Sequence, residues 1–237
     1  MQCVVLAGGL GTRMKRLSAA MPKAMIPVAG QPFIRHQLRL LDRFGVDDVV
    51  ISTGYLGEQI EAEVDAHHPT GMSVRCVGDG PVLLGTAGAL RRMASLDLLD
   101  PRFLVVYGDS YLLIDYADVW ERFDADRYSA LMTVLDNVEE LDASNVVFDG
   151  ERVVLYRKGV ADPGGKGMRF IDYGLSVLER DDLIRLVPSE GPYDLAAVFE
   201  SLSIRSRLQG YEATQRFFEI GSERGLVELE QLLSGAP

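Results

Sequence analysis

Residues 4–13, VVLAGGLGTR, decide the fold, because a short apolar segment runs directly into closely spaced glycines and an arginine. Val4–Leu6 is typical of a buried β-strand, and the glycines after it predict a loop. Backbone N–H groups of such a loop can converge on phosphate oxygens, since glycine carries no Cβ atom to block them. Arg13 adds a forked donor that suits phosphate. A plain tight turn between a strand and a helix is the alternative. The spacing matches neither G-x-G-x-x-G nor a P-loop.

Apolar runs alternate with amphipathic stretches through the first half of the chain. Besides residues 4–6, strands are expected at residues 49–51, 73–77 and 103–106, and helices at residues 33–44, 57–67, 85–93 and 115–124. Asp115 is the expected N-cap of the last of these helices. Because strand–helix alternation requires crossover connections, it predicts an α/β fold with a largely parallel sheet flanked by helices.

The pattern changes after about Ser129. Two short strand candidates, residues 146–148 and 153–156, flank Asp149-Gly150, which is a hairpin signal. Further along, a strand is expected at residues 169–178, a helix around residues 195–202, and a final helix from Ser222 to Leu233, with Ser222 as N-cap. We expect a single domain over residues 1–237, divided into halves at residues 1–128 and 129–237 and without the hexapeptide repeats of a C-terminal β-helix.

Charge and cysteine content narrow the class of protein. The chain has 24 Lys and Arg residues against 35 Asp and Glu residues, for a net charge of −11. This balance argues against a general nucleic-acid binder, which needs a basic face, but a few placed cations can still bind phosphate. Cys3 and Cys76 make no disulfide framework, the N-terminus does not read as a signal peptide, and no run of about 18 apolar residues exists. We expect a cytoplasmic protein without a membrane partner.

Lys23 lies in PKAMIPV (residues 22–28), where prolines on both sides stiffen the backbone that would place its charge on a phosphate. Alone, it is typical of an exposed loop lysine. Together, GGLGTRM (residues 8–14) and PKAMIPVAGQP (residues 22–32) closely resemble the signature of the sugar-phosphate nucleotidyltransferases. The likeness extends over most of the chain. It is greatest to the short bacterial members that act on sugar 1-phosphates, such as the heptose 1-phosphate guanylyltransferases and N-acetylmuramate 1-phosphate uridylyltransferases.

This resemblance implies a Rossmann-like nucleotide-diphospho-sugar transferase fold, whose first half binds the nucleotide and whose second half binds the sugar phosphate. The implied nucleotide-binding residues of the first loop are Leu6, Gly8, Gly9, Gly11, Thr12 and Arg13. Arg13 and Lys23 are implied to be catalytic, on the departing pyrophosphate and the reacting phosphates.

The segment DGPVLLGTA (residues 79–87) resembles the part of the family that binds base and ribose. The resemblance implies Asp79 near the base edge and Gly85 and Thr86 against the nucleoside. A plain loop into a helix with Thr86 as N-cap is the alternative. The base itself is left open.

Two acidic residues are candidates for a metal site. Asp109 follows the buried strand of residues 103–106, and ligands of open parallel sheets bind beyond the carboxyl ends of the strands; a cap or turn role is the alternative. Asp109 matches the aspartate of the family that holds Mg²⁺ against the α-phosphate. Glu219, in FFEIGS (residues 217–222), stands where the family usually has a second metal-binding aspartate, and a capping or ion-paired glutamate is the alternative.

Two further segments, YRK (residues 156–158) and IDYG (residues 171–174), resemble the segments with which the family binds the sugar phosphate. The resemblance implies that Lys158 holds the sugar phosphate and that Asp172 and Gly174 face the sugar. Arg157 replaces an acidic residue of the family, which indicates either a more anionic acceptor or a different surface.

The predicted reaction joins a nucleoside triphosphate and a sugar 1-phosphate to give a nucleotide sugar and pyrophosphate. It needs no general base, because a phosphate monoester is already anionic at neutral pH. Two alternatives stay open: a cytidylyltransferase for a phosphorylated alcohol such as phosphocholine, with an aromatic box from Tyr173, Phe217 and Phe218, and a nucleotide-sugar-binding homologue without turnover. A monomer or homodimer is expected.

Overall fold

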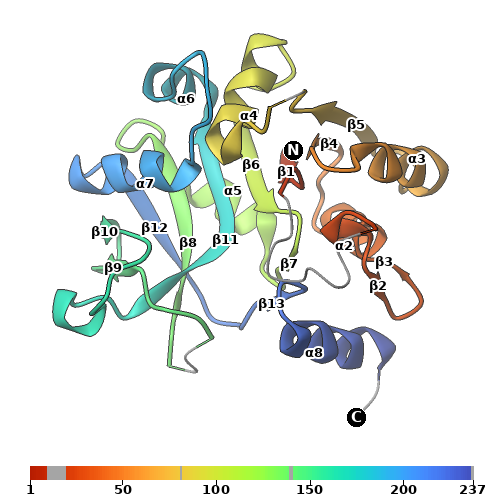
Figure 1. Cartoon of the computed structure of the whole chain (residues 1–237). Coiled ribbons are helices and arrows are strands. Elements are labelled where there is room, and N and C mark those ends of the chain that lie inside the picture. The colour runs from red at the N-terminus through yellow and green to blue at the C-terminus, as the bar shows by residue number, and fades with distance from the viewer. Residues whose placement is uncertain (10–19, 81, 139–140, 236–237) are drawn as a thin grey trace. The chain divides into compact units, whose positions relative to one another are not determined.

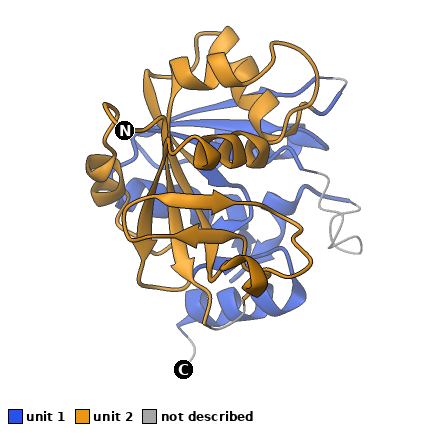
Figure 2. Ribbon diagram, turned by 90° about the vertical axis from the view of Figure 1, so that its left-hand side faces the viewer, with its two compact units in different colours: residues 1–83, 106–111, 217–237 blue, residues 84–105, 112–216 orange. Residues whose placement is uncertain are grey.

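The structure is a computed structural model that describes residues 1–9, 20–80, 82–138 and 141–235. It divides into two compact units (Figure 2). Unit 1 is made of residues 1–83, 106–111 and 217–237, and unit 2 of residues 84–105 and 112–216. Strand β6 (Arg102–Tyr107) begins in unit 2 and ends in unit 1.

Unit 1 is built on parallel strands. Strand β4 (Asp48–Thr53) pairs in parallel with β1 (Gln2–Leu6) on one side and with β5 (Ser73–Gly78) on the other. The crossovers contain α2 (Phe33–Arg43) and α3 (Gly57–His67). Because parallel strands point the same way, the carboxyl ends of β1, β4 and β5 meet at one edge of the sheet.

The rest of unit 1 joins segments from both ends of the chain. It contains the 3-10 turn η2 (Lys23–Met25), the strand pair β2 (Pro27–Val28) and β3 (Gln31–Pro32), and the antiparallel pair β7 (Ser110–Tyr111) and β13 (Phe218–Glu219). Helix α8 (Glu223–Ser234) follows. One buried apolar cluster holds these parts together, made of Ile26, Val28, Phe33, Ile220 and Leu229.

Unit 2 has a mixed sheet. Strand β8 (Ala130–Asp136) pairs in parallel with β12 (Leu208–Ala213) and antiparallel with β11 (Phe170–Glu179). The hairpin of β9 (Val146–Phe148) and β10 (Val153–Tyr156) joins β11. The other elements are α4 (Gly85–Ser95), α5 (Tyr116–Arg122), η3 (Gly164–Lys166), α6 (Arg180–Leu186) and α7 (Leu195–Ile204), and α7 packs against β10 and β12 (Figure 1).

The predicted α/β fold with a mixed sheet flanked by helices is confirmed. So are the hairpin at Asp149-Gly150, where the Asp149 side chain accepts hydrogen bonds from the backbone N–H groups of Glu151 and Arg152, and the N-caps Asp115 and Ser222. Each such cap is worth about 1 kcal/mol. The sequence patterns missed β8, β12 and the two-residue pair β7 and β13. In the part of the chain that the structure describes, no helix combines the length and apolarity that a membrane crossing needs.

Candidate functional site

Glycines gather where the parallel strands of unit 1 end. Gly8 follows β1, Gly54 follows β4, Gly78 ends β5 and Gly108 follows β6. A Cβ atom on Gly54 would overlap the carbonyl oxygen of Gly8, and one on Gly108 would lie 2.8 Å from the Cβ atom of Ala7. The backbones therefore touch one another, and this edge of the sheet is lined by peptide groups, which suits an anionic ligand. The sequence patterns missed Gly54, although it follows its strand as Gly8 does.

Asp79 lies beside this glycine edge. Its backbone N–H donates to the carbonyl oxygen of Thr53 at 3.0 Å, and its Oδ1 accepts from the Ser52 hydroxyl at 3.4 Å. A Cβ atom on Gly8 would lie 3.5 Å from the other carboxylate oxygen, and Asp79 is 7% exposed. The structure thus brings the predicted base-binding residue together with the predicted phosphate loop. Gly9 is next to them in the chain, whereas Gly11, Thr12 and Arg13 lie outside the described residues.

Lys23 and Asp109 form an ion pair. The Lys23 Nζ atom lies 2.6 Å from Asp109 Oδ2, and the exposed fractions of the two side chains are 16% and 34%. Gly221 makes room for this pair, because a Cβ atom there would lie 2.5 Å from Nζ and would also overlap Glu219. A cation and a carboxylate predicted for phosphate and metal binding therefore stand in direct contact.

The turn that carries Asp109 is tied to two neighbouring segments. The Gly108 N–H donates to the Leu6 carbonyl oxygen at 2.9 Å, and the Asp109 carbonyl oxygen accepts from the Ile220 N–H at 3.0 Å. Pairing of β7 with β13 places Ser110 opposite Glu219. The two predicted metal-binding acids are far apart in sequence, but Glu219 lies on β13 and Asp109 directly precedes its partner strand β7.

The Glu219 carboxylate is folded onto its own loop. Its Oε2 accepts from the Gly221 N–H, and its Oε1 accepts from the Ser222 hydroxyl at 2.5 Å. Ser222 in turn caps α8, because its hydroxyl oxygen accepts from the Gly225 N–H at 3.0 Å. Glu219 thus holds the loop before α8 and contacts the N-cap Ser222 without capping the helix itself, and its role as a metal ligand stays a prediction.

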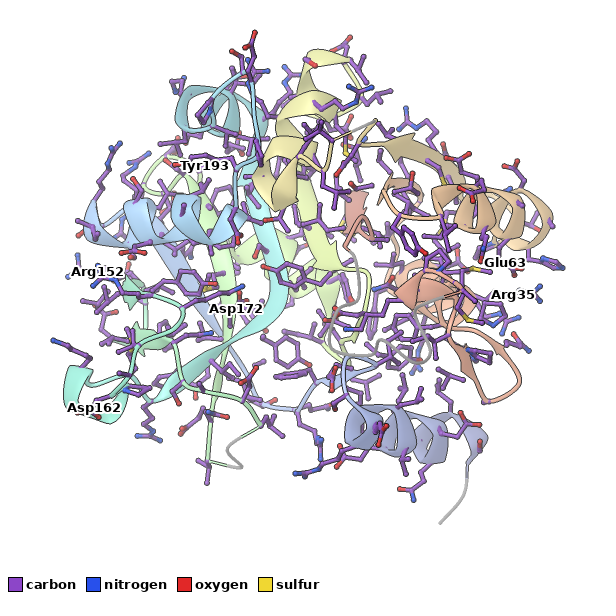
Figure 3. All side chains as sticks on the ribbon, in the orientation of Figure 1. Arg35, Glu63, Arg152, Asp162, Asp172 and Tyr193 are labelled. Atoms are coloured by element: carbon purple, nitrogen blue, oxygen red, sulfur yellow. The ribbon has the colours of Figure 1, made fainter. Side chains whose placement is uncertain are left out.

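In unit 2, the start of α4 packs against the segment before α7. The carbonyl oxygen of Tyr193 (Figure 3) accepts from the N–H groups of Ala87 at 3.0 Å and Gly88 at 3.1 Å. A Cβ atom on Gly85, whose φ is +71°, would lie 2.7 Å from that same oxygen. Two of the first four N–H groups of α4 therefore already have a partner, which the sequence patterns missed.

Thr86 is not the N-cap of α4. Its Oγ1 donates to Asp194 Oδ1 at 2.9 Å and accepts from the Leu195 N–H at 2.7 Å, so it joins the starts of α4 and α7. The nucleotide-binding role of Gly85 and Thr86 stays a prediction.

Asp172 occupies an irregular part of β11 (Figure 3), where the pairing with β8 shifts register before Ser176 and Gly174 has a φ of +107°. Its Oδ1 accepts from the Gly174 N–H at 3.1 Å, and its Oδ2 accepts from the Tyr156 hydroxyl at 3.4 Å. Burial raises the pKa of Asp172, while the nearby Lys158 ammonium acts to lower it. The predicted sugar-phosphate residues Lys158, Asp172 and Gly174 are therefore close together.

Arg157 has a partner on the helix beside it. Its Nη2 lies 2.6 Å from Glu200 Oε1 on α7, and half of its side chain is exposed. This contact favours the simpler of the two expectations for Arg157, a different surface rather than a site for a more anionic acceptor.

Comparisons with known proteins all find similarity to nucleotidyltransferases. The MobA-like NTP transferase domain matches residues 3–163, more than half of the chain. The D-glycero-alpha-D-manno-heptose 1-phosphate guanylyltransferase of Aneurinibacillus thermoaerophilus is 26% identical over 227 residues, which are 93% of each chain. The N-acetylmuramate alpha-1-phosphate uridylyltransferase of Neisseria meningitidis is 28% identical over 241 residues, 100% of this chain and 99% of the relative.

A solved structure of HddC from Yersinia pseudotuberculosis, complexed with GMP-PN, superposes with a TM-score of 0.78. The alignment covers 98% of this chain and 99% of HddC at 21% identity. This likeness shows the nucleotide-diphospho-sugar transferase fold. The family resemblance predicted from residues 8–32 is confirmed.

Proposed function

Because this chain belongs to the MobA-like NTP transferase domain family, we propose that it transfers a nucleotidyl group from a nucleoside triphosphate to a sugar 1-phosphate. The products are a nucleotide sugar and pyrophosphate. The two full-length relatives support the proposal, since both names describe nucleotidyl transfer to a sugar 1-phosphate.

The Lys23–Asp109 ion pair carries the proposal. The pair lies in unit 1, which also contains the glycine-lined edge of the parallel strands. Ligands of open parallel sheets bind beyond the carboxyl ends of the strands, which is this edge. Nucleotidyl transfer needs positive charge on the reacting phosphates and a carboxylate for a metal ion, and this pair supplies both kinds of group. Asp79, next to Gly8, is the proposed base contact of unit 1. In unit 2, Gly85 and Thr86 are the proposed nucleoside contacts.

The chemistry needs positioning rather than proton transfer. A phosphate oxygen of the acceptor attacks the α-phosphorus in line, the new P–O bond forms, and the bond to the β-phosphate oxygen breaks to release pyrophosphate. The attacking phosphate is already anionic, so the task of the protein is to align the groups and neutralise their charge. Lys23 would hold the reacting phosphates, Lys158 the sugar phosphate, and Arg13 the departing pyrophosphate.

The donor set of unit 1 fits Mg²⁺. Magnesium is bound by one or two carboxylates together with substrate phosphates and water, so a third protein ligand is not required. Within the described ranges no group of three or more acidic, histidine or cysteine side chains could hold a metal, and Asp109 and Glu219 are a pair of this simpler kind. Each carboxylate has lone pairs beyond those its present partners use. When bound, Mg²⁺ would neutralise charge on the α-phosphate.

Unit 2 would recognise the sugar. The Asp172 carboxyl group offers a hydrogen-bonding partner for a sugar hydroxyl, and the Lys158 ammonium supplies the charge that a sugar phosphate needs. The aromatic-box alternative gains no support here, because Tyr173 is buried and Phe218 packs against the apolar cluster under α8. The proposed location is the cytoplasm, where the free thiols Cys3 and Cys76 would stay reduced.

A pyrophosphate-release assay tests the proposal. The purified chain is incubated with Mg²⁺, each common nucleoside triphosphate in turn, and a panel of sugar 1-phosphates, free sugars and phosphorylated alcohols. We expect release with one class of sugar 1-phosphate and none with the free sugars, which lack the attacking phosphate. Release that is independent of the acceptor, or confined to phosphocholine, would contradict the proposal.

A further inference from the structure

Gln37 connects helix α2 to the turn that carries Asp109. Its side-chain Nε2 donates to the carbonyl oxygen of Tyr107 at 2.8 Å and to that of Ser110 at 2.9 Å. These two carbonyl groups stand on either side of Gly108 and Asp109. One amide therefore fixes both ends of the turn, and Gln37 itself is only 2% exposed.

The contacts fix the orientation of the amide. Two carbonyl oxygens face it, and only the NH₂ group of glutamine can donate to them. This orientation leaves Gln37 Oε1 buried without a hydrogen-bond partner among the described residues. A buried acceptor without a partner lowers the free energy of unfolding by about 1–3 kcal/mol. The fold therefore keeps the two bonds to the turn at the cost of one unsatisfied oxygen.

Three sets of hydrogen bonds hold the turn that carries Asp109. The Gln37 bonds come from α2, the Gly108 N–H bonds to β1 through Leu6, and the Asp109 carbonyl oxygen accepts from Ile220 beside β13. Of these three ties, Gln37 supplies the only one made by a side chain, so it can be removed by substitution without changing the backbone.

We propose that Gln37 is a positioning residue, which holds the Asp109 carboxylate where a metal ion and the reacting phosphates need it. This inference rests on the proposed function of Asp109. Gln37 touches neither substrate nor metal in this assignment. Its effect passes through the backbone of residues 107–110.

A matched control exists in unit 2. Gln209 is also buried, and it also makes two hydrogen bonds to backbone: its Nε2 donates to the Arg122 carbonyl oxygen at 3.0 Å, and its Oε1 accepts from the Asp124 N–H at 2.9 Å. It connects β12 to the end of α5, and neither of its two partners is a proposed site residue. Replacing either glutamine by methionine keeps the length of the side chain and removes both bonds.

The experiment measures Mn²⁺ binding by electron paramagnetic resonance of the free ion. It is done in the presence of the nucleoside triphosphate that the pyrophosphate-release assay selects, together with thermal unfolding of each variant. We expect Gln37→Met to weaken Mn²⁺ binding about 10-fold, the usual scale for losing a residue that orients a metal ligand. Gln209→Met should lose a similar amount of stability and leave Mn²⁺ binding unchanged. If Gln37→Met does not fold, Gln37→Asn, whose shorter side chain cannot reach both carbonyl groups, takes its place.

An Asp109→Asn variant separates the proposed metal role of Asp109 from the proposed positioning role of Gln37. Loss of Mn²⁺ binding in Asp109→Asn, with Gln37→Met behaving like Gln209→Met, overturns the positioning role alone. Unchanged Mn²⁺ binding in Asp109→Asn overturns the metal role of Asp109 and the role of Gln37 with it.

Discussion

Among the described residues, each unit places a lysine beside an aspartate, and the two arrangements differ. In unit 1, Lys23 and Asp109 are in direct contact at 2.6 Å and remain partly exposed beside a parallel sheet edge. In unit 2, the Asp172 carboxyl group is half-buried at an irregularity of a mixed sheet, where it accepts from Gly174 and Tyr156 and lies near Lys158. The same two residue types thus occupy very different environments.

The difference matters because environment sets what a carboxyl group can do. A partly exposed carboxylate beside a cation offers oxygen ligands to a metal ion, while the cation suits phosphates. A buried carboxyl group is costly to ionise, and burial therefore favours its neutral form. The proposed division of labour follows: unit 1 binds the metal ion and the phosphates of the nucleotide, and unit 2 binds the sugar phosphate, with Asp172 on a sugar hydroxyl group.

The largest effect is expected from Asp109→Asn. The substitution keeps the shape of the side chain and removes the charge proposed for the metal ion. Pyrophosphate release should fall on the order of 100-fold or more, as when other groups that stabilise charge are removed from active sites. The thermal unfolding temperature should change little, because partly exposed ion pairs contribute little to stability. Activity and unfolding are measured on the same preparation.

Asp136→Asn is the control for that substitution. Asp136 ends strand β8 in unit 2 and accepts from Arg169 Nε at 2.9 Å, so it too is a carboxylate paired with a cation at a strand end. It should retain normal activity. An Asp109→Asn protein as active as Asp136→Asn would mean that the pair in unit 1 has no part in the chemistry.

A smaller effect is expected from Gly221→Ala. The φ of Gly221 is not positive, so the backbone tolerates alanine, but the new methyl group would displace the Lys23 ammonium from its place beside Asp109. Because a displacement of about 1 Å can cost about 100-fold in rate, we expect roughly a 10-fold loss of turnover.

The comparison variant is Gly164→Ala, whose Cβ atom would meet only Asp162 Oδ1 at 3.9 Å in an exposed turn. Steady-state kinetics of both variants test the prediction. Equal turnover in the two would show that the position of Lys23 is not critical.

The smallest effect concerns the pair in unit 2 and is a change of stability with pH. Burial raises the pKa of Asp172 in the folded chain, so above the ordinary pKa the folded state keeps a proton that the unfolded state has lost. The contribution of this group to the free energy of unfolding therefore falls as pH rises through the raised pKa. Because asparagine does not titrate, the advantage of Asp172→Asn over the unchanged chain should grow from pH 4 to neutral pH in urea unfolding experiments.

Asp136 should show the opposite trend. Its hydrogen bond from Arg169 lowers its pKa, so its stabilising contribution is present above the ordinary pKa and is lost as pH falls. Asp136→Asn should therefore be at its greatest disadvantage near neutral pH. Parallel pH trends for the two variants would contradict the opposite directions of the two pKa shifts.

Local patterns in the sequence predicted the longer elements of unit 1 well, but not the short ones. The expected helix at residues 57–67 has the bounds of α3, and the expected strands fall within β1, β4, β5 and β6. Asp109 could be singled out because a buried strand runs straight into it. Each of these features depends on neighbouring residues, so a short window of sequence contains the information.

Contacts between distant segments could not be predicted in the same way. Strands β7 and β13 have two residues each and carry no periodic pattern, so nothing local indicates that Ser110 pairs with Glu219. The Tyr193 carbonyl group that occupies the start of α4 comes from a loop, and any residue could supply it. Gln37 is a polar residue on the buried, otherwise apolar face of α2. Its role becomes visible only from the two carbonyl groups that accept its hydrogen bonds.

The cluster of Ile26, Val28, Phe33, Ile220 and Leu229 has a consequence for biosynthesis. Its first three members leave the ribosome about two hundred residues before the two that cover them. Over that interval a growing chain carries an uncovered apolar surface, the kind of surface that recruits chaperones. The same later segment delivers Glu219 and Gly221, so a growing chain from which this segment has not yet emerged lacks part of its proposed metal site and is expected to be inactive.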